Sequence, residues 1–172
     1  LVLSVGLIPE NELSEGAGAL LDSRTKGAVV DENYQTTVSG VFAAGNVLHV
    51  HDLVDYVSEE ATLAGTNAAA YVRGQEKEGG SCQVALRAEN GVRYTVPQTL
   101  RPREMAEAVT VRFRVADVYK DRYISVYYDG ERVYHRKKKV LAPGEMEQVV
   151  LKKESFSGFP DLREIKICTE VE

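Results

Sequence analysis

The stretch Thr36–Val47, TTVSGVFAAGNV, decides the fold of the first part of the chain. Its Val41–Ala44 run predicts a short buried strand, because no polar residue interrupts it. Gly45 then allows a tight turn and a close backbone approach to a ligand, which a Cβ would block. Asn46 puts an amide at the carboxyl end of that strand, where open α/β sheets bind ligands. The stretch is typical of a dinucleotide site, although an ordinary tight turn has the same local sequence.

These residues resemble the second FAD-contacting motif of the pyridine nucleotide-disulphide oxidoreductase family, T-x(4–6)-G-[IV]-F-A-A-G-D. A threonine at position 36 or 37 and the run Gly40–Gly45 match in order, and Asn46 stands where the family has Asp. An Asn side chain can hydrogen-bond a ribityl hydroxyl, without the charge that a carboxylate adds. The resemblance implies that Gly45, Asn46 and Val47 contact the ribityl and pyrophosphate part of FAD.

Two flanking segments resemble the same family. Leu1–Leu13, LVLSVGLIPENEL, is similar to the strand-Gly-x-x-Pro-Asn crossing that leads from the NAD(P)-binding domain back to the FAD domain. Glu60–Ala70, EATLAGTNAAA, is similar to the family's long helix of small residues. The resemblance implies that backbone N–H groups at the start of this helix, among them those of Val54 and Asp55, face the pyrimidine edge of the flavin ring.

The residues themselves predict a helix from about Asp52 to Val72, with Asp52 as the N-cap and Gly74 just beyond the last turn. A mostly small apolar stripe suits one face of this helix to close packing on a sheet. The stripe consists of Val57, Ala61, Ala64, Ala68 and Val72. Further strands are expected near Val2–Val5 and, as an extended segment, near Ala28–Val30.

The resemblance covers residues 1–74, and the family's two G-x-G-x-x-G phosphate loops do not occur in the sequence. We therefore expect this chain to be the C-terminal piece of a longer flavoprotein whose N-terminal part supplies them. The implied cofactors are FAD and NAD(P) in that parent protein, with none bound to this piece alone. Its catalytic residues are unknown. A partial domain leaves an unprotected sheet edge and an uncovered helix face, which favours a homodimer through residues 1–74 or looser order there.

Charge and composition divide the chain into two domains. Residues 1–79 hold four basic and twelve acidic side chains, whereas residues 80–172 hold seventeen and fourteen. Six of the nine tyrosines lie between Tyr94 and Tyr134. The polar, glycine-bearing run at 73–81, RGQEKEGGS, is typical of a linker. We predict an FAD/NAD(P)-binding part at 1–74, a linker at 75–80 and a second domain at 81–172.

The second domain has the sequence pattern of an all-β fold. Apolar residues alternate with polar ones over 109–115, as in a strand with one buried face. Asp129-Gly130 separates two strand-like runs and is a strong signal for a two-residue hairpin turn. About seven short strands suggest an antiparallel sandwich of immunoglobulin-like size. They are expected at 83–88, 91–96, 109–115, 123–128, 131–136, 146–152 and 163–169, with helix signals confined to 103–107. The predicted fold is thus an α/β fragment of a Rossmann-type FAD domain followed by this sandwich.

Several classes of protein are excluded. No apolar run approaches the roughly 20 residues that span a bilayer, so no membrane association is expected. Cys82 and Cys168 form no C-x-x-C pair, and two buried free thiols in a cytoplasmic protein are favoured over a disulfide. The basic run His135–Lys139 directly follows a hairpin strand, where lysines guard an exposed edge. A solvated edge is favoured over a docking surface for an acidic partner, and no nucleic-acid binding is expected.

His49 and His51, in the sequence HVHD, imitate the H-x-H metal pair of amidohydrolase barrels. That fold needs further ligands and a much longer chain, and His135 is the third and last histidine. We therefore predict no metal site. The two histidines either line the mouth of the flavin site or lie in a surface loop.

Two functions follow from the sequence. In the first, the chain supplies the last FAD-contacting elements, plus an appended β-domain, to an FAD-dependent, NAD(P)-linked oxidoreductase. In the second, the β-domain docks a partner redox subunit and has no catalysis of its own. The substrate, the choice between NADH and NADPH, and the presence of a redox disulfide are not encoded in these residues.

Overall fold

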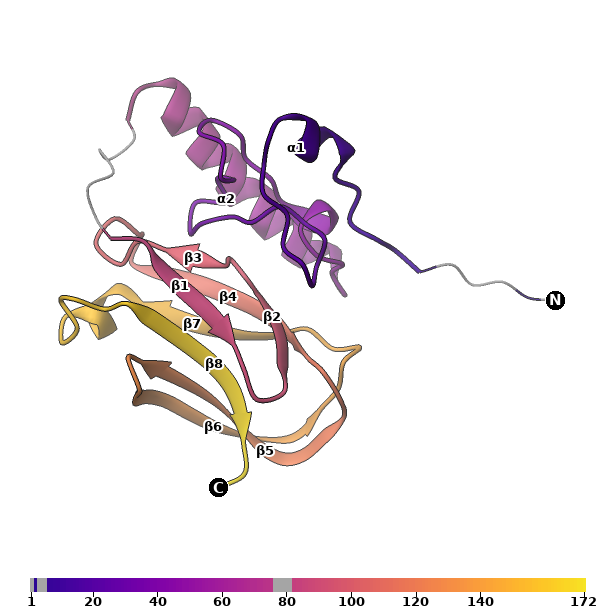
Figure 1. Cartoon of the computed structure of the whole chain (residues 1–172), viewed down its shortest axis with the longest axis vertical. Helices are drawn as coiled ribbons and strands as arrows, with labels where there is room; N and C mark the ends of the chain where they lie inside the picture. The colour runs from indigo at the N-terminus through magenta and orange to yellow at the C-terminus, as the bar shows by residue number, and fades with distance from the viewer. Residues whose placement is uncertain (1, 3–5, 76–81) are drawn as a thin grey trace. The chain divides into compact units, whose positions relative to one another are not determined.

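A computed structural model describes residues 2, 6–75 and 82–172, and it divides into two compact units (Figure 1). The first unit comprises residues 1–30 and 34–74, and the second comprises 31–33 and 75–172. Most of the expected strand at Val2–Val5 and of the linker at 75–80 lies outside the described residues. The three residues 31–33 belong to the second unit, in which Arg101 donates a hydrogen bond from its backbone N–H to Glu32 Oε2 over 3.0 Å.

The first unit consists of loops around one long helix. Its elements are the short helix α1 (Glu12–Gly16), the 3₁₀ turn η1 (Gly45–Val47) and helix α2 (Val54–Val72). Isolated bridges join Leu21 to Ala28, Val30 to Thr36, and Gln35 to Phe42. The predicted strand at Val41–Ala44 is therefore wrong as a regular element. Its residues are half-buried, and a continuous ladder needs a neighbouring strand that the described residues do not supply.

Helix α2 confirms the predicted helix but differs in its cap and in its packed face. Its N-cap is Leu53 rather than Asp52, with no side-chain cap bond, whereas Gly74 follows the C-cap with φ +66°, as predicted. Ala64 is buried, but Ala61 and Val72 of the predicted stripe are exposed. Within the described residues, no helix combines the length and the apolar character needed to cross a membrane.

The packed face of α2 is different because its second buried member is an acidic residue. Glu60 is 0% exposed, and with Ala64 it makes up the buried residues of the helix. The steps from Val57 to Glu60 to Ala64 follow the three- and four-residue spacing of one helix face. Glutamate is rarely buried without a partner, so a pattern of apolar residues could not find it.

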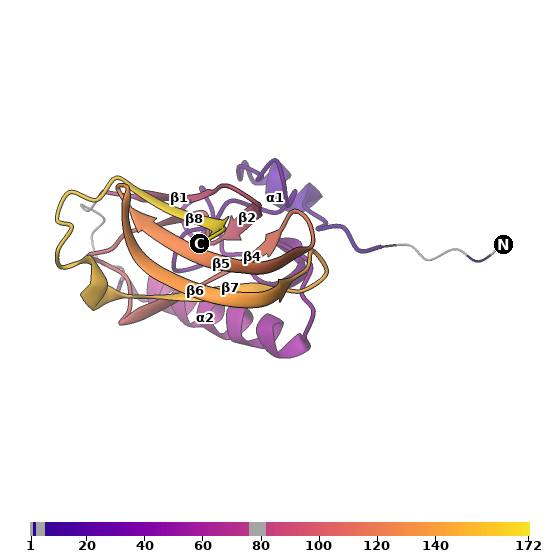
Figure 2. The same cartoon turned by 90° about the horizontal axis from the view of Figure 1, so that it is seen from below.

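The second unit is built from two sheets, and its strands are labelled in Figures 1 and 2. The five-stranded sheet has the order β3-β1-β8-β5-β6, and the three-stranded sheet has the order β2-β4-β7. The long hairpin of β5 and β6 is drawn in orange tones in Figure 2. The strands are β1 (Val84–Ala88), β2 (Val92–Val96), β3 (Thr99–Leu100), β4 (Ala108–Val115), β5 (Tyr119–Tyr128), β6 (Glu131–Leu141), β7 (Glu147–Lys152) and β8 (Glu164–Glu170).

The seven strand ranges predicted for this unit each overlap one strand, with β5 and β6 longer than predicted, and the two-residue hairpin is confirmed. Tyr128 pairs with Glu131 around Asp129 and Gly130, whose φ angles are +45° and +93°. Positive φ at both central residues is the signature of the type I′ turn that Asp-Gly favours. The two-residue strand β3 was not predicted.

The strand-rich character of the second unit is confirmed, but the prediction of a purely antiparallel arrangement is wrong. Strands β1 and β8 pair in parallel, with Ala85 opposite Glu164. Residues 84–88 and 164–170 are far apart in the sequence, so no hairpin imposes antiparallel pairing on them. An immunoglobulin-like topology stays a prediction.

The core of this unit draws side chains from both sheets. Phe113 of β4 and Ile165 of β8 are each 0% exposed and belong to the same cluster. The alternation predicted for 109–115 places Val109, Val111, Phe113 and Val115 inside, as expected. Arg112 was expected on the solvated face, but it is also buried.

The two cysteines are free thiols, but only one of them is buried. Cys168 in β8 is buried, whereas Cys82 is exposed, so the prediction of two buried thiols is wrong for Cys82. Burial, with a smaller contribution from Glu170, raises the pKa of Cys168 to about 11. A buried thiol that stays protonated is a poor nucleophile.

We expect a thiol reagent such as DTNB to modify one cysteine per chain in the native protein and the second only after unfolding. The Cys82→Ser variant should show no fast reaction, whereas the Cys168→Ser variant should keep it. Mass spectrometry of the labelled peptides identifies the modified residue. Fast labelling of Cys168 in the folded protein would contradict its burial.

Candidate functional site at the start of helix α2

The turn at Gly45 has the geometry that the sequence predicts. Its φ is +77°, and a Cβ built on it would lie 3.0 Å from Cγ1 of Val57 in α2. The backbone N–H of Leu48 donates to the Gly45 carbonyl over 2.9 Å and closes the turn. Gly45 therefore meets two requirements for glycine, a left-handed backbone and a close approach to a neighbouring helix.

Asn11 joins this turn to the preceding loops. Its Nδ2 donates to the carbonyl oxygens of Val47, over 2.8 Å, and Lys26, over 3.0 Å. Asn11 is 5% exposed, so these hydrogen bonds are shielded from water. Asn11 lies in the segment Leu1–Leu13 that resembles the family's crossing, and the structure shows that its side chain holds η1.

The start of α2 has no side-chain cap from its N-cap residue. Leu53 supplies no side-chain cap, and both Val54 and Asp55 are exposed. The first N–H groups of a helix have no partner within the helix, and they carry its positive dipole end. An uncapped helix start of this kind suits a polar or anionic ligand group.

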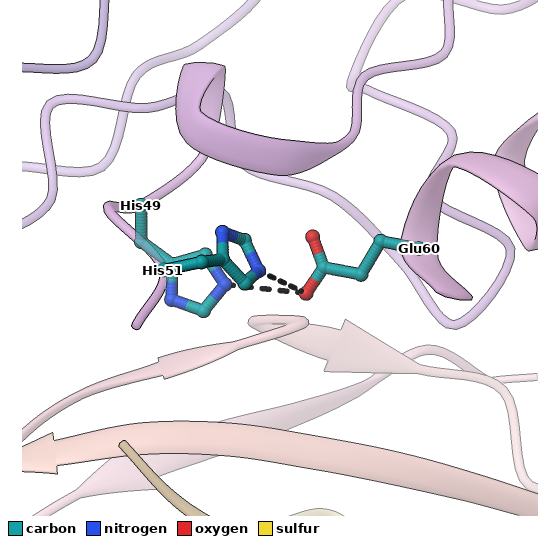
Figure 3. A group of neighbouring side chains, drawn as sticks. All are labelled: His49, His51 and Glu60. Carbon is teal, nitrogen blue, oxygen red and sulfur yellow. Dashed lines mark hydrogen bonds and ion pairs between the residues drawn. The ribbon is translucent and has the colours of Figure 1, made fainter. Parts of the chain in front are cut away.

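The imidazoles of His49 and His51 both face the buried carboxylate of Glu60 in α2 (Figure 3). The Nε2 atoms of His49 and His51 lie 3.3 Å and 2.9 Å from Oε1 of Glu60. The other oxygen, Oε2, accepts a hydrogen bond from the backbone N–H of Gly45 over 3.1 Å. The three side chains are at most 1% exposed. Glu60 therefore links α2 to both ends of the segment 45–51.

Glu60 carries a negative charge at neutral pH despite its burial. Burial acts to raise its pKa, but the contacts with His49 and His51 and their positive charge outweigh burial and lower the pKa to about 2. A carboxylate that is buried in this way requires cationic neighbours, because an unpaired buried charge is strongly disfavoured.

Asn46 and His51 hold each other in place at the outer side of this cluster. Oδ1 of Asn46 accepts a hydrogen bond from the backbone N–H of His51 over 3.1 Å and lies 3.2 Å from its Nδ1. The backbone donor identifies Oδ1 as the oxygen of the amide. The Nδ2 group of Asn46 is then the end that can reach a ligand, and Asn46 itself is exposed.

The arrangement corrects one interpretation of the histidines. The alternative that they lie in a surface loop is wrong, because both imidazoles are buried against Glu60. The pairing was not visible in the sequence, since the metal sites that the H-x-H pattern resembles take further histidine and aspartate ligands rather than a glutamate on a helix. The signal that could have found it is Glu60, eleven residues after His49 and at the start of the small-residue run of the predicted helix.

A comparison with protein families assigns the segment that carries this site. Residues 1–68 match the family model of the pyridine nucleotide-disulphide oxidoreductases. Residues 1–68 belong to this family. The resemblance seen in the sequence is thereby confirmed for this family segment, and the remaining residues lie outside the match. No curated protein and no solved structure gives a significant match to the chain.

The structure brings the predicted cofactor-binding residues together on one stretch of chain. Gly45, Asn46 and Val47 form η1, Val54 and Asp55 form the first turn of α2, and η1 contacts α2. Their contact with FAD stays a prediction.

The sequence did not indicate a groove in the second unit, which has a volume of about 720 Å³. Its lining includes three cationic side chains and two phenylalanines (Arg103, Lys153, Arg163, Phe156 and Phe159) together with the exposed Cys82. Arg103 and Lys153 each donate to a backbone carbonyl, of Pro160 and Met105 respectively, so their positions are tied to the surrounding loops.

Proposed function

We propose that the family segment supplies the last FAD-contacting elements of an FAD-dependent, NAD(P)-linked oxidoreductase, to which the strand-rich unit is appended. Gly45, Asn46 and Val47 contact the ribityl and pyrophosphate side of the cofactor. The first-turn amides of Val54 and Asp55 face the flavin ring. The observation that carries the proposal is a glycine turn, followed after six intervening residues by a helix start whose N-cap residue makes no side-chain cap bond, within a segment of this family.

The residues present fit one side of the cofactor. The left-handed Gly45 leaves space that a side chain would fill, and the exposed Asn46 offers Nδ2–H groups to a ribityl oxygen. A glycine-rich loop for the pyrophosphate does not occur in the sequence, so these residues form part of a cofactor site rather than the whole. FAD, when bound, supplies the hydride chemistry, and this chain's residues orient it.

In this arrangement Asn46 acts as a hydrogen-bond donor toward the cofactor. The Asp that the family has at this position can only accept when ionised. Here His51 occupies the amide oxygen of Asn46, so its Nδ2 is directed by the same contact. With Asn in place of Asp, the side chain thus donates the hydrogen bond to the cofactor instead of accepting it.

The test compares the 172-residue chain with the longer protein that the proposal requires, which includes a dinucleotide-binding half. We expect the longer protein to be yellow and the shorter chain to be colourless. In the longer protein, Asn46→Leu should weaken FAD binding by about tenfold or more, because a lost hydrogen bond and an added apolar side chain together cost about 1.4 kcal/mol or more. Flavin absorption per chain and titration of the stripped protein with FAD measure both effects.

Two control variants separate this contact from a general loss of structure. Asn46→Asp restores the family residue and should retain FAD, and Gln75→Leu makes the same amide-to-leucine change at an exposed position outside the matched segment. The proposal fails if Asn46→Leu retains FAD as well as Gln75→Leu does. Near-stoichiometric flavin on the 172-residue chain would contradict the requirement for the missing phosphate loop.

A second candidate function concerns the strand-rich unit, which we propose as the docking module for a partner redox subunit. Strand β6 is an outer strand of its sheet, and it carries the basic run at 136–139 with mostly exposed side chains. Lys138 pairs with Glu147 over 2.7 Å, so β6 is a solvated strand edge when no partner is bound. The other cationic side chains of β6 would face an acidic surface of the partner, because interfaces pair opposite charges.

A further inference from the structure

The cluster of His49, His51 and Glu60 presents the donor set of a metal site. Two imidazole nitrogens and one carboxylate oxygen lie within 4.8 Å of one another. Zinc commonly binds through His nitrogens and Glu oxygens at about 2.0–2.2 Å, often with three protein ligands and one open position. Tetrahedral geometry at these bond lengths separates neighbouring donor atoms by roughly 3.3 Å. The two nitrogen–oxygen separations in the cluster, 3.3 Å and 2.9 Å, are close to this value.

The contact between His51 and Glu60 is short, but within the described part of the chain Nε2 of His51 lacks an aligned hydrogen bond. Nε2 of His51 lies 2.9 Å from Oε1 of Glu60, yet it has no aligned hydrogen-bond partner among the described residues. Either a proton on Nε2 or a metal ion between the two atoms offsets the repulsion of their lone pairs at this distance. A buried nitrogen that faces a carboxylate without an aligned bond is suited to a metal ion.

The surrounding hydrogen bonds orient two of the ligands. Nδ1 of His51 lies 3.2 Å from Oδ1 of Asn46, which can accept the single proton that a metal-bound imidazole keeps on Nδ1. The lone pair of Nε2 then points into the cluster. Oε2 of Glu60 is held by the N–H of Gly45 over 3.1 Å, and Oε1 faces the two imidazoles. Outer hydrogen bonds of this kind fix ring orientation in metal sites.

We propose that His49, His51 and Glu60 bind a divalent transition metal ion of the zinc class, which ties the segment 45–51 to α2. Nitrogen and carboxylate donors in this combination suit zinc better than calcium or magnesium, which take oxygen ligands. The sequence predicted no metal site, and the converging geometry is the reason for the change. The inference does not depend on FAD binding, because the three proposed ligands are buried side chains that the proposed FAD contacts do not use.

The test measures zinc binding to the whole chain without any cofactor. Protein stripped with a chelator, incubated with ZnCl₂ and passed through a desalting column should retain about one zinc per chain by elemental analysis. Glu60→Gln and His51→Gln should each lower zinc affinity by more than about 100-fold, because loss of an outer partner alone costs about 10- to 100-fold. His135→Gln removes the third histidine, which lies outside the cluster, and should bind zinc like the unmodified chain.

A second measurement uses the unmodified chain, so misfolding of a variant cannot affect it. The chain has three histidines, so ring nitrogen signals in NMR can be followed one by one. Zinc should shift the Nε2 signals of His49 and His51 and leave His135 unchanged. Zinc that is absent after desalting, or bound equally by Glu60→Gln, overturns the proposal. Protons that stay on both ring nitrogens of His51 in excess zinc also overturn it, because they identify an ion pair without metal.

Discussion

Replacing Gly27 by alanine is expected to lower the free energy of unfolding of the first unit by about 3 kcal/mol or more. Gly27 is buried, and a Cβ at this position would overlap the backbone carbonyl group and Cα of Leu48. A side chain can rotate away from an added methyl group, but a backbone segment has to move as a whole. Leu48 directly precedes His49 and is 0% exposed, so its displacement disturbs the cluster on Glu60.

The measurement is urea unfolding followed by the far-UV helical signal, to which α2 is the main contributor among the described helices. Gly65→Ala is the matched control, because Gly65 lies on the exposed side of α2 and a Cβ added there would meet open space. Alanine is favoured over glycine within a helix, so this variant should be stabilised by about 0.5–1 kcal/mol. A Gly27→Ala variant as stable as the unmodified chain would show that Leu48 is not held where the structure has it.

Replacing Glu60 by alanine is expected to cost about 3–5 kcal/mol, because it removes one partner from a buried charged cluster and leaves the others unpaired. The carboxylate contacts both imidazoles and accepts the hydrogen bond of the Gly45 N–H. Its loss therefore weakens the connection between η1 and α2. The experiment is carried out on chelator-treated protein, so that loss of a bound ion does not contribute.

Glu59→Ala removes the same charge from the neighbouring exposed position and should change stability by less than about 0.5 kcal/mol. Hydrogen exchange adds a local measurement, since the Gly45 amide should exchange faster in Glu60→Ala than in Glu59→Ala. Equal unfolding free energies in the two variants would mean that the cluster contributes nothing net to stability.

The features that could be predicted from the sequence are those that depend on neighbouring residues. Alternation of apolar and polar residues located the strands of the second unit, and Asp129-Gly130 located its hairpin, because both reflect local backbone preferences. Gly45 indicated a left-handed turn for the same reason, and its φ of +77° confirms it. The family motif added the identity of the segment, which the family match confirms for residues 1–68.

The features that could not be predicted depend on contacts between distant residues. Pairing of β1 with β8 in parallel joins strands separated by most of the second unit, and no local pattern specifies such a partner. Burial of Arg112 and Glu60 likewise contradicts their polarity, since only a surrounding tertiary structure makes the burial of a charge favourable.

The sequence by itself thus determined where the strands of the second unit, helix α2 and the glycine turn lie, because backbone conformation is chosen locally by side-chain branching, periodicity and glycine. Only the tertiary structure decided that Glu60 meets His49 and His51, and that Asn11 holds the carbonyl of Val47. Hydrogen bonds and charge pairs between separated segments depend on how the chain folds back on itself. The composition of the candidate site was therefore present in the sequence, whereas its geometry was a product of the fold.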